Sequence, residues 1–142
     1  MRVPIYEALA HYKRNEMLPY TEYFGLGFFT DISLAESTIA ESKKLVGFSD
    51  LNDNSFSITT HYLNDCAHIG NEVSYEIINN KVYGVWYDYD IDDYYTCSGY
   101  IGLFSTLEYA EKALKWYKTW DIFKVYGLDC LGIDTITLNL RG

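Results

Sequence analysis

The chain has 142 residues and a mass of 16.5 kDa, which is the common size of a single domain. Its apolar content of 49% with only two prolines excludes a disordered chain. Twenty acidic against eleven basic residues give a net charge of −9, which argues against a protein that mainly binds nucleic acid or anionic lipid, because both ligands need clustered lysine and arginine.

Each half of the chain is predicted to form strand, strand, helix, strand. Strands are expected where aromatic and β-branched residues alternate with polar ones, or where glycine and aromatic residues concentrate. They fall at residues 5–13, 23–29 and 56–63 in the first half, and at 82–89, 100–104 and 133–140 in the second.

A helix is expected directly after the second strand of each half. Ser105 and Glu108 have the spacing of a capping box, and Thr30 occupies the matching N-cap position in the first half. Ser33 and Glu36 offer a second capping box there.

Apolar positions spaced i, i+3 and i+7 predict one buried stripe on each helix. These positions are Ile32, Ala35 and Ile39 in the first helix and Leu107, Ala110 and Leu114 in the second. The helices are expected to end near Val46 and Trp120.

The two halves are related by an internal duplication. A shift of 75 residues aligns residues 1–67 with 76–142 without a gap, and 13 of the 67 pairs are identical, where composition alone would give about four. The identical pairs include Gly27/Gly102, Phe29/Phe104, Ala35/Ala110, Leu63/Leu138 and Asn64/Asn139. We therefore interpret 1–67 as the first repeat, 68–75 as a connector and 76–142 as the second repeat of one compact two-repeat domain.

The duplication predicts an α+β fold with six mainly antiparallel strands and two helices in a pseudo-twofold arrangement. A three-stranded unit with one helix covers only one face of its sheet, so two units together bury more surface. The shared glycine of the second strand, Gly27 or Gly102, predicts a strand bulge or a close approach of the helix.

Cysteine use and the N-terminal sequence predict a cytoplasmic protein. Cys66, Cys97 and Cys130 are about thirty residues apart and form no C-x-x-C pair, which favours free thiols in a reducing compartment. The N-terminus lacks an apolar signal region, and no stretch reaches the roughly 18 apolar residues of a spanning helix.

One segment resembles a known family. The run of residues 102–113, GLFSTLEYAEKA, resembles a small bacterial domain of unknown function marked by a strand end G-(hydrophobic)-F-S/T and a helix with an Ala-Glu pair. The first repeat carries the same pattern at 27–30 and at Ala35-Glu36. The resemblance implies a compact α/β module of bacterial or phage source and transfers no catalytic residue. In size and charge the chain is also similar to bacterial toxin-immunity proteins.

The sequence contains no constellation typical of an enzyme, a cofactor site or a metal site. It has no G-x-S-x-G turn and no P-loop, and Gly25-Leu26-Gly27 lacks the third glycine of a dinucleotide fingerprint. His61, Asp65, Cys66 and His68 lie close in sequence but lack the paired spacing of zinc ligands, so a solvated loop is favoured. We expect no enzyme activity, no catalytic residue, no cofactor and no bound metal.

The strongest local anomaly is an acidic, tyrosine-rich segment at residues 87–95. Eight of its nine residues are predicted to bind a partner: Tyr87, Asp88, Tyr89, Asp90, Asp92, Asp93, Tyr94 and Tyr95. The start imitates a calcium loop, but Asp93 stands where a glycine is needed and Gly99 where a glutamate should ligate, which rejects an EF-hand and leaves weak cation binding open.

Two interpretations of this segment remain. It is either a solvated hairpin whose like charges keep a strand edge from pairing, or a recognition surface on which tyrosine supplies contact area and carboxylates select a basic partner. The matching residues 12–20 of the first repeat keep the end tyrosines but not the acids.

These observations predict a non-enzymatic protein-binding module, immunity- or antitoxin-like, that neutralises a basic partner such as a toxic nuclease domain through the acidic hairpin. Nucleic acid and membrane are not expected as ligands. The alternatives are a structural or regulatory module that self-associates through an exposed strand, and a small-molecule-binding domain that uses the cleft between the repeats. The oligomeric state is left open.

Overall fold

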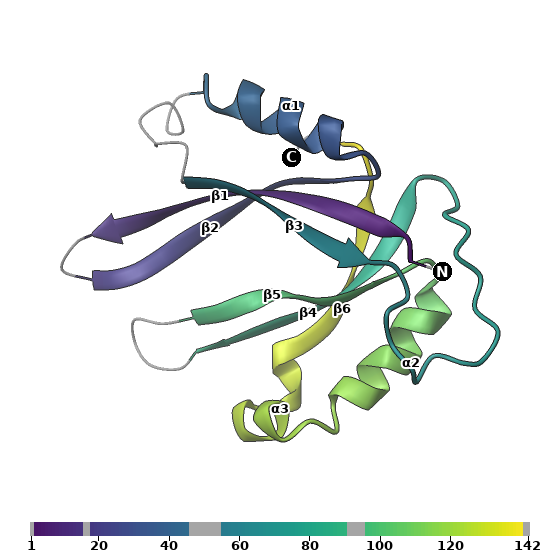
Figure 1. Ribbon diagram of the computed structural model, residues 1–142. Helices are drawn as coiled ribbons and strands as arrows, with labels where there is room; N and C mark the ends of the chain where they lie inside the picture. The colour runs from purple at the N-terminus through teal and green to yellow at the C-terminus, as the bar shows by residue number, and fades with distance from the viewer. Residues whose placement is uncertain (1, 16–17, 46–54, 91–95, 141–142) are drawn as a thin grey trace. The chain divides into compact units, whose positions relative to one another are not determined.

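The structure is a computed structural model that describes residues 2–15, 18–45, 55–90 and 96–140. Within these residues the chain forms six antiparallel strands in two three-stranded sheets, together with three α-helices and one 3₁₀ turn (Figure 1). The predicted α+β class is therefore confirmed. The same element order occurs about 75 residues apart, which is consistent with the duplication.

The chain divides into two compact units, which we describe separately. The first-sheet unit contains residues 4–61 and 138–142, and the second-sheet unit contains residues 1–3 and 62–137. Each unit thus includes a short segment from a distant part of the chain, residues 138–142 in the first-sheet unit and residues 1–3 in the second.

The first-sheet unit has the strand order β2-β1-β3. Its elements are β1 (Pro4–Asn15), β2 (Leu18–Phe29), α1 (Ile32–Ser42) and β3 (Phe56–Tyr62). Helix α1 packs on one face of this sheet (Figure 1). Small and large apolar side chains interdigitate in the core between them: Ala8, Ala10, Leu26, Phe29 and Ala35.

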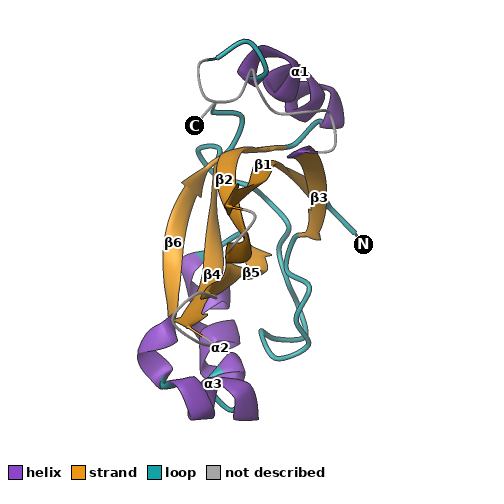
Figure 2. Cartoon of the chain, turned by 90° about the vertical axis from the view of Figure 1, so that its left-hand side faces the viewer, coloured by secondary structure: helices purple, strands orange, loops and turns teal. Residues whose placement is uncertain are grey.

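The second-sheet unit has the strand order β5-β4-β6, with α2 across one face of the sheet (Figure 2). Its elements are β4 (Lys81–Asp90), β5 (Thr96–Phe104), α2 (Leu107–Tyr117), α3 (Asp121–Tyr126), the 3₁₀ turn η2 (Leu128–Cys130) and β6 (Leu131–Thr137). Its core includes Ile69, Val85, Phe104, Ala110, Ala113 and Phe123.

The prediction of two helices is wrong in the second repeat, where α2 ends at Tyr117 and a separate α3 follows. The hydroxyl of Thr119 donates to the carbonyl of Trp116 at 2.7 Å, and Trp120 has an extended backbone (φ −71°, ψ 134°). A side-chain bond of this kind competes with helix continuation, so the chain turns before it becomes helical again. Helix α1 also ends earlier than predicted, at Ser42.

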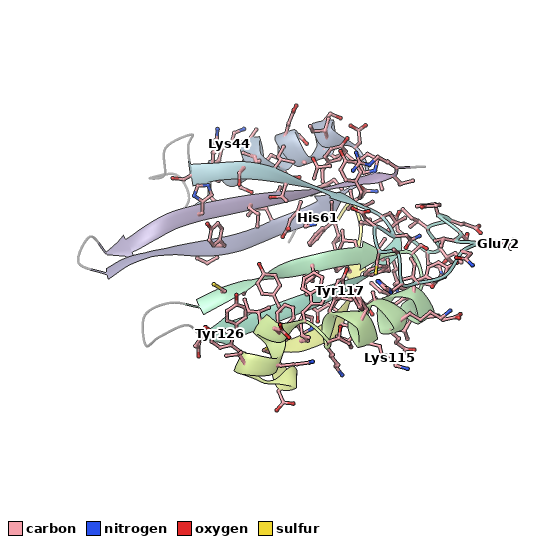
Figure 3. The ribbon with its side chains drawn as sticks, turned by 60° about the horizontal axis from the view of Figure 1, so that its bottom comes forward. Lys44, His61, Glu72, Lys115, Tyr117 and Tyr126 are labelled. Carbon is pink, nitrogen blue, oxygen red and sulfur yellow. The ribbon has the colours of Figure 1, made fainter. Side chains whose placement is uncertain are left out.

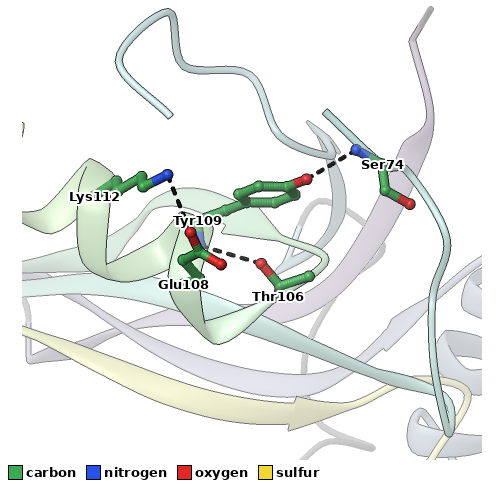
Figure 4. A network of polar contacts seen from close by, with 5 residues as sticks. All are labelled: Ser74, Thr106, Glu108, Tyr109 and Lys112. Atoms are coloured by element: carbon green, nitrogen blue, oxygen red, sulfur yellow. Dashed lines mark hydrogen bonds and ion pairs between the residues drawn. The ribbon is translucent and has the colours of Figure 1, made fainter. Parts of the chain in front are cut away.

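The predicted helix caps are one residue too early. Asp31 caps α1, and its Oδ1 accepts from the hydroxyl of Ser33 at 2.8 Å and from the backbone N–H of Ser33 at 2.9 Å. These two hydrogen bonds lower the pKa of the Asp31 carboxyl. Thr106 caps α2 by accepting from the backbone N–H of Tyr109 at 3.1 Å (Figure 4). Thr30 and Ser105, the predicted caps, form hydrogen bonds with Asn139 and Asn64 instead.

The predicted buried stripes are only partly confirmed. Ala35 and Ala110 are fully buried, but Ile32 and Leu107 are 45% and 47% exposed. The buried stripes run instead through Ala35, Thr38 and Ser42 in α1 and through Ala110, Ala113 and Tyr117 in α2, which are again positions 75 residues apart. Mostly small side chains face the sheet, so each helix lies close to it.

The bulge predicted at the shared glycine is confirmed in both sheets. The pairing skips one residue between Ala8↔Gly27 and Leu9↔Gly25, and between Val85↔Gly102 and Trp86↔Tyr100. The rings of Phe29 and Phe104 lie over these glycines, so a Cβ atom would come within 2.8 Å and 2.9 Å of ring carbons. Gly27 also has a φ of 137°, which side chains rarely allow.

An asparagine lies two residues after the closing strand of each repeat and bonds to the strand–helix junction of the other repeat. Asn64 is buried, and its Oδ1 accepts from the backbone N–H of Ser105 at 2.9 Å while its Nδ2 donates to the carbonyl of Ser74 at 3.0 Å. Its own backbone N–H donates to the carbonyl of Leu103 at 2.8 Å.

The equivalent Asn139 repeats this arrangement in the first-sheet unit. Its backbone N–H donates to the carbonyl of Phe28 at 2.7 Å, and its Oδ1 accepts from the backbone N–H of Thr30 at 3.0 Å. Both asparagines have left-handed backbones, with φ of 58° for Asn64 and 60° for Asn139, which asparagine tolerates better than most residues. The two Asn side chains therefore satisfy the strand–helix junctions at which the predicted caps were expected.

We expect Asn64→Ala to lower the free energy of unfolding by about 2–3 kcal/mol, because it leaves the buried N–H of Ser105 without its acceptor and strains a left-handed residue. Asn139→Ala, whose side chain is exposed, should lower it by about 1 kcal/mol. Urea unfolding measures both, and Asn64→Gly separates the lost hydrogen bonds from the backbone strain. An equal loss at the two positions would contradict the stated role of burial.

Candidate functional site

The structure describes residues 87–90 of the predicted partner-binding segment, and Asp92, Asp93, Tyr94 and Tyr95 lie outside the described residues. Side chains alternate along β4, so that Tyr87 and Tyr89 are partly buried and Asp88 and Asp90 are exposed. Asp88 and Asp90 therefore lie on the face of the strand opposite to Tyr87 and Tyr89.

The tyrosine face of β4 holds α3. Tyr89 stacks on Tyr126 with ring centroids 4.4 Å apart, and Tyr87 and Tyr89 each lie 6.3 Å from Phe123. Tyr126, the last residue of α3, lies near the end of the sheet where β4 ends and β5 begins, whereas Tyr117 is the last residue of α2 (Figure 3). Aromatic pairs at these separations stabilise packing beyond the area they bury. Tyr87 and Tyr89 thus anchor a helix within the unit.

Burial raises the pKa of three tyrosines in this unit above the ordinary value. It raises the pKa of Tyr87 and of Tyr89, and in both cases the neighbouring Cys97 on β5 adds to the shift. Burial also raises the pKa of Tyr117, with Cys66 as the next contributor. The hydroxyls of the three side chains are therefore protonated throughout the physiological range.

The acid face of β4 extends beyond the pairing with β6. The register between β4 and β6 ends at Tyr87↔Leu131, so Asp88 and Asp90 lie on the portion of β4 that pairs with β5. Their partners across that pair are Ser98 and Thr96, which carry no charge. Two exposed carboxylates therefore sit on the same face of a strand whose other face is packed.

The histidines considered as metal ligands have other partners. The Nε2 atom of His61 lies 2.9 Å from Oε1 of Glu7, and His68 stacks on Trp116 with ring centroids 3.8 Å apart. In the described part of the chain, no group of three His, Cys, Asp or Glu side chains is close enough to hold a metal ion. Cys66, Cys97 and Cys130 are free thiols, as predicted.

The Glu7–His61 pair was not identified from the sequence, because its members are 54 residues apart. It joins β1 to β3, and its side chains are only 12% and 14% exposed. The equivalent residues of the second repeat, Val82 and Ile136, face each other in the β4–β6 register and are both buried. The alignment of the repeats contained the signal, because Glu7 and His61 are polar at positions where the second repeat has Val82 and Ile136.

A second network fixes the connector to α2. The backbone N–H of Ser74 donates to the hydroxyl of Tyr109 at 3.0 Å, and one turn of helix carries an ion pair between Glu108 and Lys112 at 3.1 Å (Figure 4). Glu108, predicted to complete a capping box, therefore pairs along the helix instead. The ion pair is exposed and contributes little to stability.

Among the described residues, none of the helices has the length and apolarity needed to cross a membrane. Comparisons of the chain with protein-family models, with curated proteins and with solved structures find no match. The resemblance of residues 102–113 to a bacterial domain, and the likeness to immunity proteins, therefore stay predictions.

The second repeat provides the control for the Glu7–His61 pair. We expect Glu7→Val or His61→Ile alone to lower the free energy of unfolding by about 3 kcal/mol, because each leaves one buried polar group without its partner. The double variant restores the apolar pair of the other sheet and should unfold within about 1 kcal/mol of the wild type or above it. A double-mutant cycle by urea unfolding checks this, and additive losses would contradict it.

The raised pKa of Tyr117 predicts a loss of stability at alkaline pH. The unfolded tyrosine ionises near pH 10, its ordinary value, while the folded one still holds its proton, so the unfolded state gains as pH rises above about 10. The slope reaches at most about 1.4 kcal/mol per pH unit. Urea midpoints across this range should fall less steeply for Tyr117→Phe than for the wild type. An equal fall for Tyr117→Phe and the wild type would contradict this prediction.

Proposed function

We propose that the chain is a non-enzymatic, cytoplasmic protein-binding module of the immunity or antitoxin type, which neutralises a basic partner through β4 and its hairpin. The observation that carries this proposal is the two-faced strand. Asp88 and Asp90 are exposed on one face, while Tyr87 and Tyr89 are packed against α3 on the other. A recognition surface requires such a rigid support, because a fixed side chain loses less entropy on binding.

The negative charge of residues 87–95 also supports a basic partner. The segment 87–95 carries four of the twenty acidic residues and no basic residue, in a chain of net charge −9. Carboxylates in this arrangement accelerate encounter with a basic surface and repel an acidic one. Neutralising a toxic nuclease domain would follow from covering the cationic surface with which such a domain binds nucleic acid.

The structure changes the role of the tyrosines in this mechanism. Tyr87 and Tyr89 pack against α3 within the unit, so in this proposal contact with the partner falls to the carboxylates of Asp88 and Asp90. Tyr87 and Tyr89 therefore contribute to binding indirectly, because they hold β4 in place.

The test is the association rate with the partner, isolated by affinity capture from the source cells and then purified. We expect the variant with Asp88, Asp90, Asp92 and Asp93 all changed to Asn to associate about tenfold more slowly at low salt, with a smaller difference at high salt because exposed charges are then screened.

A matched variant removes the same charge elsewhere. Glu36, Glu72, Glu76 and Glu111 are exposed and lie outside β4, and changing all four to Gln also removes four negative charges. This variant should associate within about threefold of the wild type. Equal slowing by the two variants would show that only net charge matters and would refute the hairpin as the binding surface.

A further inference from the structure

Two aromatic side chains lie on the same face of the second sheet as Asp88 and Asp90. Trp86 precedes Asp88 by two residues in β4, so strand alternation places both side chains on this face. Tyr100 of β5 is the direct partner of Trp86 across the strand pair, and directly opposed residues of antiparallel strands share a face. Val85, by contrast, belongs to the core under α2. The face opposite α2 and α3 therefore combines aromatic rings with carboxylates.

Two glycines allow these rings to lie directly over neighbouring strands. Trp86 is half-buried and pairs with Gly132 of β6, where a Cβ atom would overlap the indole ring. The ring of Tyr100 lies over Gly84 of β4, where a Cβ atom would come within 2.7 Å of a ring carbon. A larger residue at either glycine would displace a ring. The backbone of the sheet thus supports both rings.

A hydrogen bond holds Tyr100 in this position. Its hydroxyl donates to Oδ2 of Asp134 on β6 at 3.0 Å. Because β4 lies between β5 and β6 in the sheet, this bond spans the width of β4. Asp134 is itself exposed, and it adds a carboxylate to the aromatic face.

The first repeat has different residues at the centre of this surface. The shift of 75 residues aligns Trp86 with His11 and Asp88 with Lys13. The ring is smaller there and the charge beside it is reversed. The combination of tryptophan and carboxylate is therefore specific to the repeat that carries the acidic segment 87–95.

We propose that this surface binds an arginine side chain of the basic partner, with its guanidinium on the ring of Trp86 and paired with the carboxylate of Asp88. The inference rests on the proposed function and names the residue that the partner presents. Side chains two positions apart on one face of a strand are separated by about 7 Å. A cation interacts with a tryptophan ring within about 6 Å of its centroid, so one guanidinium can reach both groups.

Arginine fits this surface better than lysine does. A guanidinium is planar, stacks on an aromatic ring and donates two parallel N–H bonds to one carboxylate. The ammonium of lysine is a compact, strongly hydrated charge, which loses more hydration on a ring. The net charge of −9 attracts either cation, so a preference for arginine reports the contact with Trp86 rather than the overall charge.

Two peptides of equal charge test the proposal on the full, purified chain. One is a Gly-Ser peptide with four arginines, and the other has four lysines at the same positions. Isothermal titration calorimetry at low salt should show about fivefold higher affinity for the arginine peptide. Equal affinities overturn the arginine site. In that case, slower association of the native partner with the Asp-to-Asn variant would still support the proposed function.

Trp86→Leu removes the aromatic ring and keeps an apolar side chain over Gly132. It should reduce the preference for the arginine peptide to within about twofold. Trp116→Leu removes an exposed tryptophan of α2 and is the matched control, which should keep the preference of the wild type. A preference that persists in Trp86→Leu overturns the assignment of the ring.

Asp88→Asn tests the carboxylate at an exposed position. It should weaken binding of the arginine peptide about fivefold, because a neutral amide cannot form the charge-assisted pair. Glu111→Gln also removes one negative charge, from an exposed position on α2, and should weaken binding by less than about twofold. Equal weakening by the two variants would show that only net charge attracts the peptide, and would overturn the site.

Discussion

Two asparagines, Asn64 and Asn139, hold the strand–helix junctions on which both units depend. The backbone N–H of each asparagine donates to a carbonyl near the end of a strand. The side-chain oxygen of each asparagine accepts from the backbone N–H of the residue just before the helix cap. Without the asparagine, the backbone N–H of Ser105 or Thr30 would lie next to a helix N-terminus and have no acceptor. Because the asparagine that satisfies it comes from the far end of the other repeat, neither helix junction is complete within its own repeat.

The same junction explains the sequence pattern that the two repeats share. The glycine two residues before the phenylalanine forms a bulge, and the phenylalanine ring covers it. The next residue, Thr30 or Ser105, bonds to the asparagine, and the residue after that caps the helix. The hydroxyls at Thr30 and Ser105 have the right chemistry for capping, but a distant partner takes them, and the cap moves one position along the chain.

Two differences in chemistry between the sheets stand out among the described residues. Glu7 and His61 form a polar pair where the second sheet has Val82 and Ile136. Along β4, acids face solvent and tyrosines support α3. The acidic character of 87–95 was visible in the sequence, and strand alternation separates Asp88 and Asp90 from Tyr87 and Tyr89. The helix that the tyrosines support was not foreseen, because the apolar pattern after Leu107 continues past the break at Thr119.

The sequence by itself determined the six strands, the first helix of each repeat, the shared glycine bulge and the free cysteines, because backbone sterics and side-chain periodicity act over a few residues. Only the tertiary structure decided the caps, the break that separates α3 from α2 and the partners of Glu7, Asn64 and Asn139. Hydrogen-bond partners are chosen by distance in space, and these lie 41 to 109 residues apart along the chain. A buried polar group must be satisfied, and the local sequence does not specify which distant residue satisfies it.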